Sequence, residues 1–304
     1  MKEKPFSKYQ ILANAVMIIW TLAIILPFIL LFMSSITDEN TLVANGYSFF
    51  PKKFSLASYS YIIKSGGQIL KAYGVSIGVT VVGTLLNVLL SALMAYPLSV
   101  KNLPGRNVMM FFVFFTMLFN GGLVPTYINY TTVFHVKDTF FGLLVPSLMM
   151  SALNVLLMKS YFVTGVPDEI LEAADIDGSN EFETMWKIAI PLSKPIITTV
   201  AMFSGIAYWN DWNNGYIYLT KRTDLYSIQN LLNRLMQNIQ ALTQNANNMA
   251  QAGEGLSQIP SGTVRMAMAA LGILPIMIIY PFIQKNFVKG ITPVSYTHLR
   301  AHET

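Results

Sequence analysis

The chain has 304 residues, of which 53% are hydrophobic and only 12% are charged, and its net charge is +5. Soluble domains carry roughly 25% charged residues, so this composition excludes a disordered chain and a nucleic-acid-binding protein, argues against a soluble enzyme and favours a membrane protein. Cysteine is absent and histidine occurs three times, which excludes a disulfide framework and a metal centre built on Cys or His. We therefore expect neither a metal nor a cofactor in this chain.

Six apolar segments are long enough to cross a bilayer, whose hydrocarbon core of about 30 Å requires roughly 20 helical residues. They are residues 11–33, 73–98, 108–130, 139–160, 195–219 and 266–286. The apolar run of the first is longer than that of a cleavable signal peptide. Small residues allow close helix packing in lipid, so Gly74, Gly78 and Gly83 place the second segment inside a bundle. The sequence predicts an all-α membrane protein with six transmembrane helices.

The distribution of Lys and Arg favours an N-terminus on the inside. Cytoplasmic segments carry an excess of these residues, and residues 1–10 contain three lysines. Six spans return the chain to the same side. We therefore expect a multi-pass protein of the bacterial cytoplasmic membrane, with both termini in the cytoplasm.

Two long segments then face outward, residues 34–72 and residues 220–265. The second has apolar residues at helical spacing. They are Ile228, Leu231, Leu232, Leu235, Ile239 and Leu242. This spacing predicts an amphipathic helix, which either lies on the outer face or against a partner, or simply caps the bundle.

The inner loop, residues 161–194, combines two short helices with a glycine turn between them. A proline presets the first turn and is followed by two acidic residues, which suit the positive end of a helix dipole. A glycine with positive φ ends the first helix, and a Ser or Asn caps the second. A further proline ends the second helix, and another opens the fifth span. The residues expected in these roles are Pro167, Gly178, Ser179 or Asn180, Pro191 and Pro195.

Both short helices have an apolar face with acidic flanks. The apolar residues are Ile170, Leu171, Ala173, Ala174, Ile176, Phe182, Met185, Trp186 and Ala189, and the acidic ones are Asp168, Glu169, Glu172, Asp175, Asp177, Glu181 and Glu183. An apolar ridge outside the membrane needs a cover. A helix lying on the bilayer normally has a basic polar face, so this acidic loop favours a protein partner with a cleft over an interfacial position.

About 20 residues of this loop follow one spaced pattern. Its members are Glu172, Ala173, Ala174, Gly178, Ile188, Ile190 and Pro191. The pattern resembles the EAA motif of ABC importer permeases, in which leucine usually stands at the position of Ile190.

Flanking stretches extend the resemblance over about residues 10–290. They are Val166-Pro167-Asp168-Glu169, Asp177-Gly178-Ser179, Tyr208-Trp209-Asn210-Asp211-Trp212 and Leu225-Tyr226-Ser227-Ile228-Gln229. Together they look like the carbohydrate-uptake, maltose-type branch of the family, and most like its permeases for oligosaccharides.

The resemblance implies a type I ABC importer permease fold, with the transmembrane domain over residues 73–286 and residues 161–194 as the coupling loop. This chain would pair with a second permease subunit and with a cytoplasmic ABC ATPase dimer that binds ATP and Mg. An extracellular solute-binding protein would deliver the sugar, and this chain would hydrolyse nothing. The residues implied to engage the ATPase are Glu172, Ala173, Ala174, Asp177, Gly178, Ile188 and Pro191.

A possible sugar path lies near the outer half of the fifth span. Sugars bind aromatic faces and amide or carboxylate groups, and this stretch offers both in Trp209, Asn210, Asp211 and Trp212. The alternative is an aromatic belt, because Trp and Tyr collect at membrane–water interfaces. Asp211 favours the sugar path, since ionisable residues in membranes tend to be functional.

An ion-coupled secondary transporter is the alternative function. Such a protein usually has ionisable residues at mid-membrane, and spans one to four and six show none there. Residues 287–304 form the C-terminal tail. Within it, residues 293–304 depart from the family pattern and look non-native, so we assign them no function.

Overall fold

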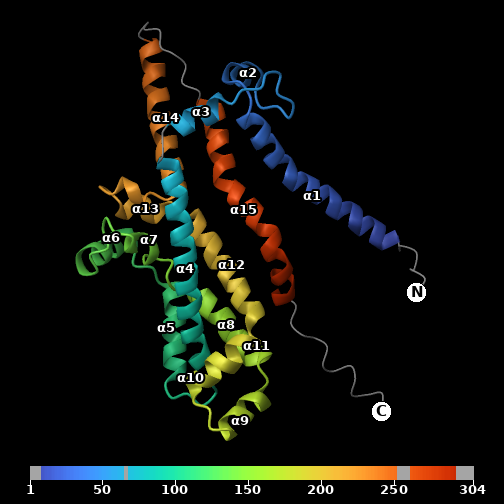
Figure 1. Ribbon diagram of the computed structural model, residues 1–304, viewed down its shortest axis with the longest axis vertical. Coiled ribbons are helices and arrows are strands. Elements are labelled where there is room, and N and C mark those ends of the chain that lie inside the picture. Colours follow the sequence, from blue (N-terminus) through green and yellow to red (C-terminus); the bar gives the residue numbers. More distant parts are fainter. Residues whose placement is uncertain (1–7, 65–67, 252–260, 292–304) are drawn as a thin grey trace. The chain divides into compact units, whose positions relative to one another are not determined.

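The computed structural model describes residues 8–64, 68–251 and 261–291, and nearly all of their regular structure is helical (Figure 1). The only strand-like feature in these ranges is an isolated bridge between Thr37 and Phe54. The expectations for residues 293–304 lie outside the described residues. The chain divides into two compact units, one formed by Met1–Ile69 with Leu232–Pro275 and the other by Leu70–Leu231 with Ile276–Thr304.

Three helical stretches are long and apolar enough to span a membrane: α1 (Lys8–Ser35), α4 (Gln68–Ser99) and the Gly262–Ile279 part of α15 (Ser261–Ile291). These helices contain the first, second and sixth predicted spans. Two bent helix pairs pass the same test, so the described residues hold up to five spans. The all-helical membrane class is as predicted, and six spans stays a prediction.

The third predicted span is not one straight helix. It is divided into α5 (Arg106–Leu118) and α6 (Leu123–Ile128), and the second half of this pair is bent by 115° from the first. Gly122 at the bend has a φ of +84°, which glycine adopts without steric cost. The Asn120 side chain accepts a hydrogen bond from the Gly122 N–H at 2.9 Å. Apolar composition alone did not reveal this turn.

The fourth predicted span is also interrupted. Only its first and last parts are helical, as α7 (Phe141–Leu144) and α8 (Ala152–Gly165). Between them, Pro146 lacks the N–H that a continuing helix needs, and Ser147 has a φ of +65°. The chain therefore enters α8 later than the apolar run predicts.

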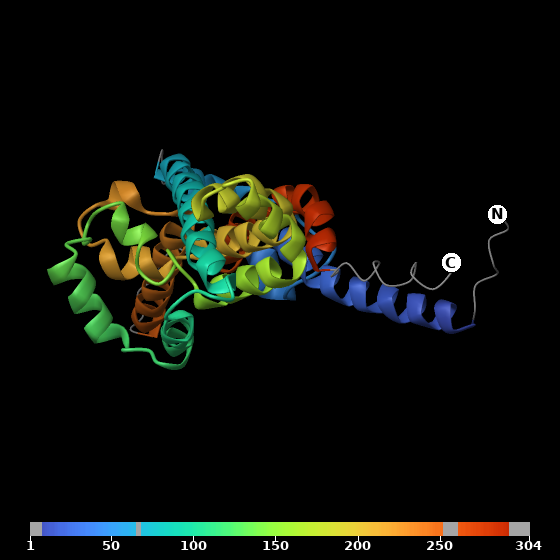
Figure 2. The same cartoon turned by 90° about the horizontal axis from the view of Figure 1, so that it is seen from below.

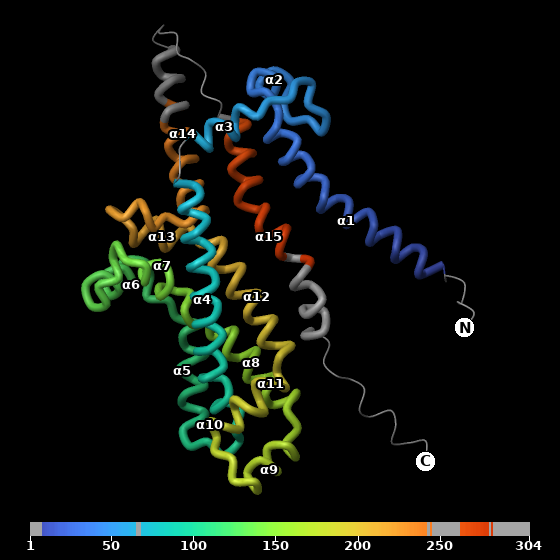
Figure 3. Tube along the Cα trace, in the orientation of Figure 1, coloured from blue at the N-terminus to red at the C-terminus, as the bar shows by residue number. Residues whose placement is uncertain are grey.

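The other elements of the larger unit follow the path shown in Figure 3. They are η1 (Asn129–Val133), α9 (Asp168–Ile176), α10 (Glu181–Thr184), η2 (Met185–Ala189), α11 (Ile190–Leu192), α12 (Lys194–Asn210), α13 (Asn213–Tyr218) and η3 (Thr223–Leu225). Seen from below, α6 and α13 lie together to one side of α4 (Figure 2).

The core of this unit joins α4, α5, α8, η2 and α12. Its buried members are Ala92, Ala95, Tyr96, Leu98, Val113, Val155, Met158, Phe162, Val166, Met185, Ala189, Ile196 and Val200. Gly83 lies directly against the Tyr208 ring, where a Cβ would clash, whereas a Cβ on Gly74 or Gly78 would meet nothing within 4 Å. Close packing of α4 through glycine is therefore confirmed at Gly83 alone.

A buried polar cluster links three helices of this unit. Asn154 donates from Nδ2 to Asn87 Oδ1 at 2.9 Å, and Ser204 Oγ donates to the same oxygen at 2.7 Å. Asn87 Nδ2 in turn donates to the Leu148 carbonyl at 2.8 Å. Each such interhelical bond in a membrane contributes about 0.6–2 kcal/mol, so the cluster fixes how α4, α8 and α12 pack.

The smaller unit is organised around Glu39, the first residue of α2 (Glu39–Asn45). Its carboxylate accepts hydrogen bonds from the N–H groups of Gly262 and Thr263, at 2.9 and 2.8 Å. A negative charge at this end of α15 is favoured by the helix dipole. Ser58, in α3 (Ala57–Lys64), donates from Oγ to Thr263 Oγ1 at 2.7 Å. The segment that contains α2 and α3 is thus tied to the start of α15.

The predicted amphipathic helix of residues 220–265 is present as α14 (Ile228–Gln251). Most of its described apolar positions are covered, since Ile228, Leu231, Leu232 and Ile239 are buried. This burial favours a helix that packs on its own chain over one that offers its apolar face to a partner.

Candidate functional site

Residues 161–194 are the expected coupling loop and keep this name, and their first helix ends in a glycine turn. Gly178 has a φ of +77°, as its role in the sequence predicted. The Ser179 N–H donates to the Ala174 carbonyl at 2.9 Å and the Gly178 N–H to the Asp175 carbonyl at 3.0 Å. These two bonds form a Schellman motif, which satisfies carbonyls that a helix end leaves unpaired.

The second helix begins at the predicted cap. Of the two candidates, Asn180 is the cap, because its Oδ1 accepts from the Glu183 N–H at 2.9 Å. The prediction that Pro191 ends this helix is wrong. The chain continues through η2 and α11 to Leu192 before the bend of 82° into α12. A wider π-helical turn precedes the proline, and such irregularities accommodate a missing backbone donor.

Some of the apolar residues predicted to form a ridge on the loop pack into the protein, and the others are exposed. Ala174, Met185 and Ala189 are buried, and Leu171 packs on the core of the unit. The residues left exposed are Ile170, Ile176, Phe182 and Trp186, at 40–86%. We call these four residues the exposed ridge. Fewer apolar residues are therefore available to a partner than the sequence predicted.

The residues expected to engage an ATPase occupy different environments. Glu172, Ala173, Asp177, Gly178 and Pro191 are exposed, Ile188 is half-buried and Ala174 is buried. Ala174 therefore packs against its own chain, whereas Ala173 and Glu172 remain available to another protein. The helices α9 and α10, which carry several of these exposed residues, lie at the end of the larger unit farthest from α13 (Figure 1).

Two contacts that sequence reasoning missed hold this loop to the end of α4. Lys101 Nζ donates to Asp168 Oδ2 at 2.6 Å, and Tyr96 Oη donates to Glu181 Oε2 at 2.9 Å. The hydrogen bond and charge of Asp168 raise the pKa of Lys101, but both side chains are exposed and water screens the pair. These partners are 67 and 85 residues apart, so no local pattern could reveal them.

The stretch expected to form a sugar path is not continuous helix. The fifth predicted span is interrupted at Asp211, whose ψ of 109° is extended, between α12 and α13. The Asp211 carboxylate accepts from the N–H groups of Asn213 and Asn214 at 3.1 and 3.3 Å. These bonds satisfy donors at the start of α13. Asp211 thus has a structural role that accounts for its position.

The other three residues of the stretch do not share one site. Asn210 Nδ2 donates back to the Ile206 carbonyl at 3.0 Å. Trp212 is 44% exposed, and its ring packs against Tyr216 with centroids 5.9 Å apart. Trp209 is buried and lines a cavity of about 290 Å³. Trp209 is thus the one member of the predicted set that contributes to a cavity of this size.

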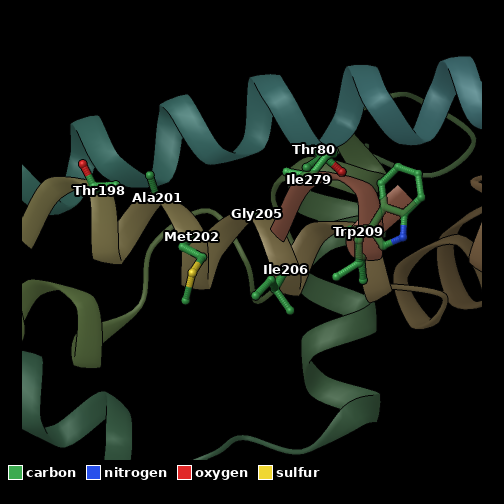
Figure 4. Close-up of a pocket in the computed structure, with 9 residues that line it drawn as sticks. Thr80, Thr198, Ala201, Met202, Gly205, Ile206, Trp209 and Ile279 are labelled. Atoms are coloured by element: carbon green, nitrogen blue, oxygen red, sulfur yellow. The ribbon is translucent and has the colours of Figure 1, made fainter. Parts of the chain in front are cut away.

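This cavity lies in the larger unit, against α4, α12 and the second half of α15 (Figure 4). Its wall is almost entirely apolar, and Thr80 and Trp209 lie at the same end of it (Figure 4). Among the described residues, the buried hydroxyls of Thr80 and nearby Thr84 have no hydrogen-bond partner. Thr198 differs, since its hydroxyl donates to the Lys194 carbonyl at 2.9 Å. The cavity therefore has an aromatic ring in its wall, with a buried hydroxyl that has no partner among the described residues beside it.

The Asp138 carboxylate, between η1 and α7, holds the backbone that follows α13. Asp138 Oδ1 accepts from the N–H groups of Lys221 and Thr220 at 2.8 and 2.7 Å, and Oδ2 accepts from the Thr220 hydroxyl at 2.9 Å. The backbone N–H of Lys221, with those of its neighbours, holds the pKa of Asp138 well below its usual range. No cluster of three or more His, Asp or Glu side chains that could hold a metal occurs in the part of the chain that the structure describes.

The geometry defines a helical membrane protein with an acidic loop held at one end of its bundle. Residues 72–293 match the family described as the binding-protein-dependent transport system inner membrane component. The chain belongs to this family, and is therefore an inner-membrane permease component whose ATPase is a separate subunit.

Individual relatives cover nearly the whole chain. It is 35% identical to the polygalacturonan/rhamnogalacturonan transport system permease protein YtcP of Bacillus subtilis (strain 168), over 93% of this chain and 96% of that protein. The arabinooligosaccharides transport system permease protein AraQ of the same organism is 24% identical, over 94% and 95%. Both are permeases of transport systems for sugar polymers by name.

A solved structure shares the fold. It is a chain of a bacterial ABC transporter involved in the import of the acidic polysaccharide alginate, and the TM-score is 0.76 at 27% identity. The match covers 93% of this chain and 100% of that chain. The predicted fold class, a type I ABC importer permease, is confirmed.

Proposed function

We propose that this chain moves a sugar or oligosaccharide across the cytoplasmic membrane by alternating access, driven by an ATPase that docks on the coupling loop. The proposal rests on how the coupling loop is held and which of its residues are exposed. It is anchored to the core through Met185 and Ala189, yet it leaves Glu172, Ala173 and the exposed ridge uncovered. An apolar ridge flanked by acidic groups suits a cleft with basic residues better than it suits lipid.

The substrate class rests on the relatives. YtcP and AraQ are named for sugar polymers, and the solved transporter imports the acidic polysaccharide alginate. Oligosaccharides are therefore the substrates to test first, with both neutral and acidic chains.

The partners follow from the family. A binding-protein-dependent component works with a solute-binding protein outside and an ATPase inside, and we add a second, different permease subunit as its partner in the membrane. The ATPase dimer binds ATP and Mg. This arrangement requires the coupling loop in the cytoplasm, which, with six spans, places both termini there as well.

Within the loop, each exposed residue has a distinct part. Glu172 pairs with a basic residue of the ATPase groove, and Ala173 keeps that face of α9 slim enough to enter. Gly178 supplies the turn, since other residues rarely adopt positive φ. Asp177 and Pro191 flank the same surface, whereas Ala174 and Ile188 support it from within.

The sugar path on this chain is the cavity beside Trp209. An aromatic ring and the unpaired Thr80 hydroxyl supply stacking and a hydrogen bond, the two contacts that sugars commonly use. The cavity of about 290 Å³ is at the lower end of the range for ligand pockets, about 300–1,000 Å³. This subunit would therefore contact one part of an oligosaccharide, and the second permease would supply the rest.

The assembled transporter in proteoliposomes tests the function. We expect oligosaccharide uptake only with ATP on the coupling-loop side and the solute-binding protein on the other. Uptake driven by an ion gradient without ATP would instead support a secondary transporter and contradict the proposal.

A further inference from the structure

We infer that the hydrogen bond between Tyr96 and Glu181 is the strut that passes movement of the coupling loop into α4. Both are positioning residues, because they touch neither the sugar nor ATP. The inference rests on the proposed function, since it requires the coupling loop to be driven by an ATPase.

The bond joins two elements that are remote in sequence. Tyr96 is in the last turn of α4, and Glu181 is the first residue of α10 in the coupling loop. The Tyr96 hydroxyl donates to Glu181 Oε2 at 2.9 Å across 85 residues of chain. An ionised acceptor makes such a bond stronger than one between neutral groups.

The Tyr96 end of the strut is held rigidly. The side chain is only 6% exposed and belongs to the core that joins five helical elements. Its ring packs edge-to-face on Phe162 of α8, with centroids 6.0 Å apart and planes at 84°. Because a packed ring has one orientation, a displacement of its hydroxyl is passed to α4 and α8.

The Glu181 end moves with the loop. Glu181 follows the cap residue Asn180 and leads directly into η2. The other polar link from the loop to the α4 end, Lys101 with Asp168, has both side chains more than 60% exposed. Two flexible, hydrated side chains transmit little force. Glu181 is also exposed, but its partner Tyr96 is buried, so the Tyr96–Glu181 link is fixed at one end.

A cavity of about 340 Å³ lies beside the bond, between residues of α10 and η2 and residues at and after the end of α4. It is lined by Leu93, Tyr96, Pro97, Val100, Leu103, Glu181, Phe182 and Met185. Tyr96 and Glu181 carry the only polar side-chain groups in this set. A void provides no packing contacts across it, so the hydrogen bond is the polar link between the two walls of this cavity, beside the apolar packing of Met185 and Ala189 on the core.

Removing the Tyr96 hydroxyl tests the strut, because Tyr96→Phe keeps the ring and its packing. In the reconstituted complex, the ATPase should still co-purify and hydrolyse ATP. We expect sugar uptake per ATP hydrolysed to fall about 5-fold or more, the lower end of allosteric coupling between sites. A purely structural role would lower the melting temperature without changing this ratio.

Matched variants isolate the bond. Glu181→Ala should have the same effect, and the double variant should be no worse than either single one, because both changes remove one interaction. Glu181→Gln keeps an acceptor and should retain most of the coupling. Tyr161→Phe, on the same core, is the control and should leave uptake per ATP unchanged.

Two results separate the strut from the proposed function. If Glu172→Lys disrupts uptake but Tyr96→Phe and Glu181→Ala leave uptake per ATP at the wild-type value, the strut is wrong and the docking loop stands. If Glu172→Lys also leaves uptake and ATPase binding unchanged, the docking function itself is wrong. Additive losses in the double variant would likewise overturn the strut.

Discussion

The coupling loop and the Trp209–Trp212 stretch carry similar signals in the sequence but differ in the structure. Both place acidic and aromatic residues next to a membrane span. In the Trp209–Trp212 stretch, the Asp211 carboxylate accepts hydrogen bonds from N–H groups at the start of α13, and the Asn210 side chain donates to a carbonyl of its own helix. In the loop, Glu172 and most of its acidic neighbours remain exposed. The fold uses the Asp211 carboxylate internally, whereas the exposed acidic residues beside the exposed ridge remain available to another protein.

The largest expected effect is on the loop side of this comparison. Glu172→Lys places a like charge against the basic groove, and losing one partner of a desolvated charge pair costs about 2–5 kcal/mol. Uptake should therefore fall by about 30-fold or more, since 1.4 kcal/mol is tenfold. Asp224→Lys, the same charge change on an exposed residue of η3, is the control and should be near wild type. An equal loss of uptake in Glu172→Lys and Asp224→Lys would contradict a specific docking role for Glu172.

The cavity supplies the next effect. Thr80→Val keeps the shape and removes a hydroxyl that has no partner among the described residues. If the hydroxyl binds sugar, one hydrogen bond of about 1 kcal/mol is lost, and the apparent sugar affinity falls about 5-fold. Stability should not decrease, because no bond within the chain is broken. Thr198→Val is the control and should leave the sugar affinity unchanged. An unchanged sugar affinity in Thr80→Val would contradict a role for the Thr80 hydroxyl in sugar binding.

Asp211 distinguishes a cap from a sugar ligand. Asp211→Ala should lower the free energy of unfolding by about 1 kcal/mol, the usual cost of losing a capping side chain. Asp211→Asn should be nearly neutral, because Asn caps as well as Asp. Thermal denaturation in detergent measures both. Weaker sugar affinity in Asp211→Asn, without loss of stability, would return Asp211 to the substrate path.

The smallest effect concerns Asp138 and pH. Its pKa is lower in the folded protein than the unfolded value of about 3.9, because backbone N–H groups stabilise the carboxylate. The stabilisation is therefore complete above the unfolded pKa and is lost as pH falls toward the folded one. Asp138→Asn should lower the melting temperature slightly at neutral pH, and the difference should shrink below about pH 4. A difference independent of pH would contradict this origin.

Much of the fold was readable from the sequence, because hydropathy and helix signals act locally. α1, α4, α14 and the Gly178 turn are where the patterns placed them. The breaks at Gly122 and Ser147 were missed, since an average over an apolar run conceals one residue with positive φ. The side-chain contacts Tyr96–Glu181 and Lys101–Asp168 were also missed, because they depend on packing between segments that are distant in sequence. The role of Pro191 was misjudged because the π-helical turn before it has no sequence signature.

A cross-linking measurement tests the central claim most directly. The chain contains no cysteine, so a single Ala173→Cys provides one reactive thiol on the exposed face of α9. In the assembled transporter, this thiol should cross-link to the ATPase subunit, with a yield that changes when ATP binds, while Asp224→Cys should give no such product. An Ala173→Cys complex that transports normally but never cross-links to the ATPase would contradict the account.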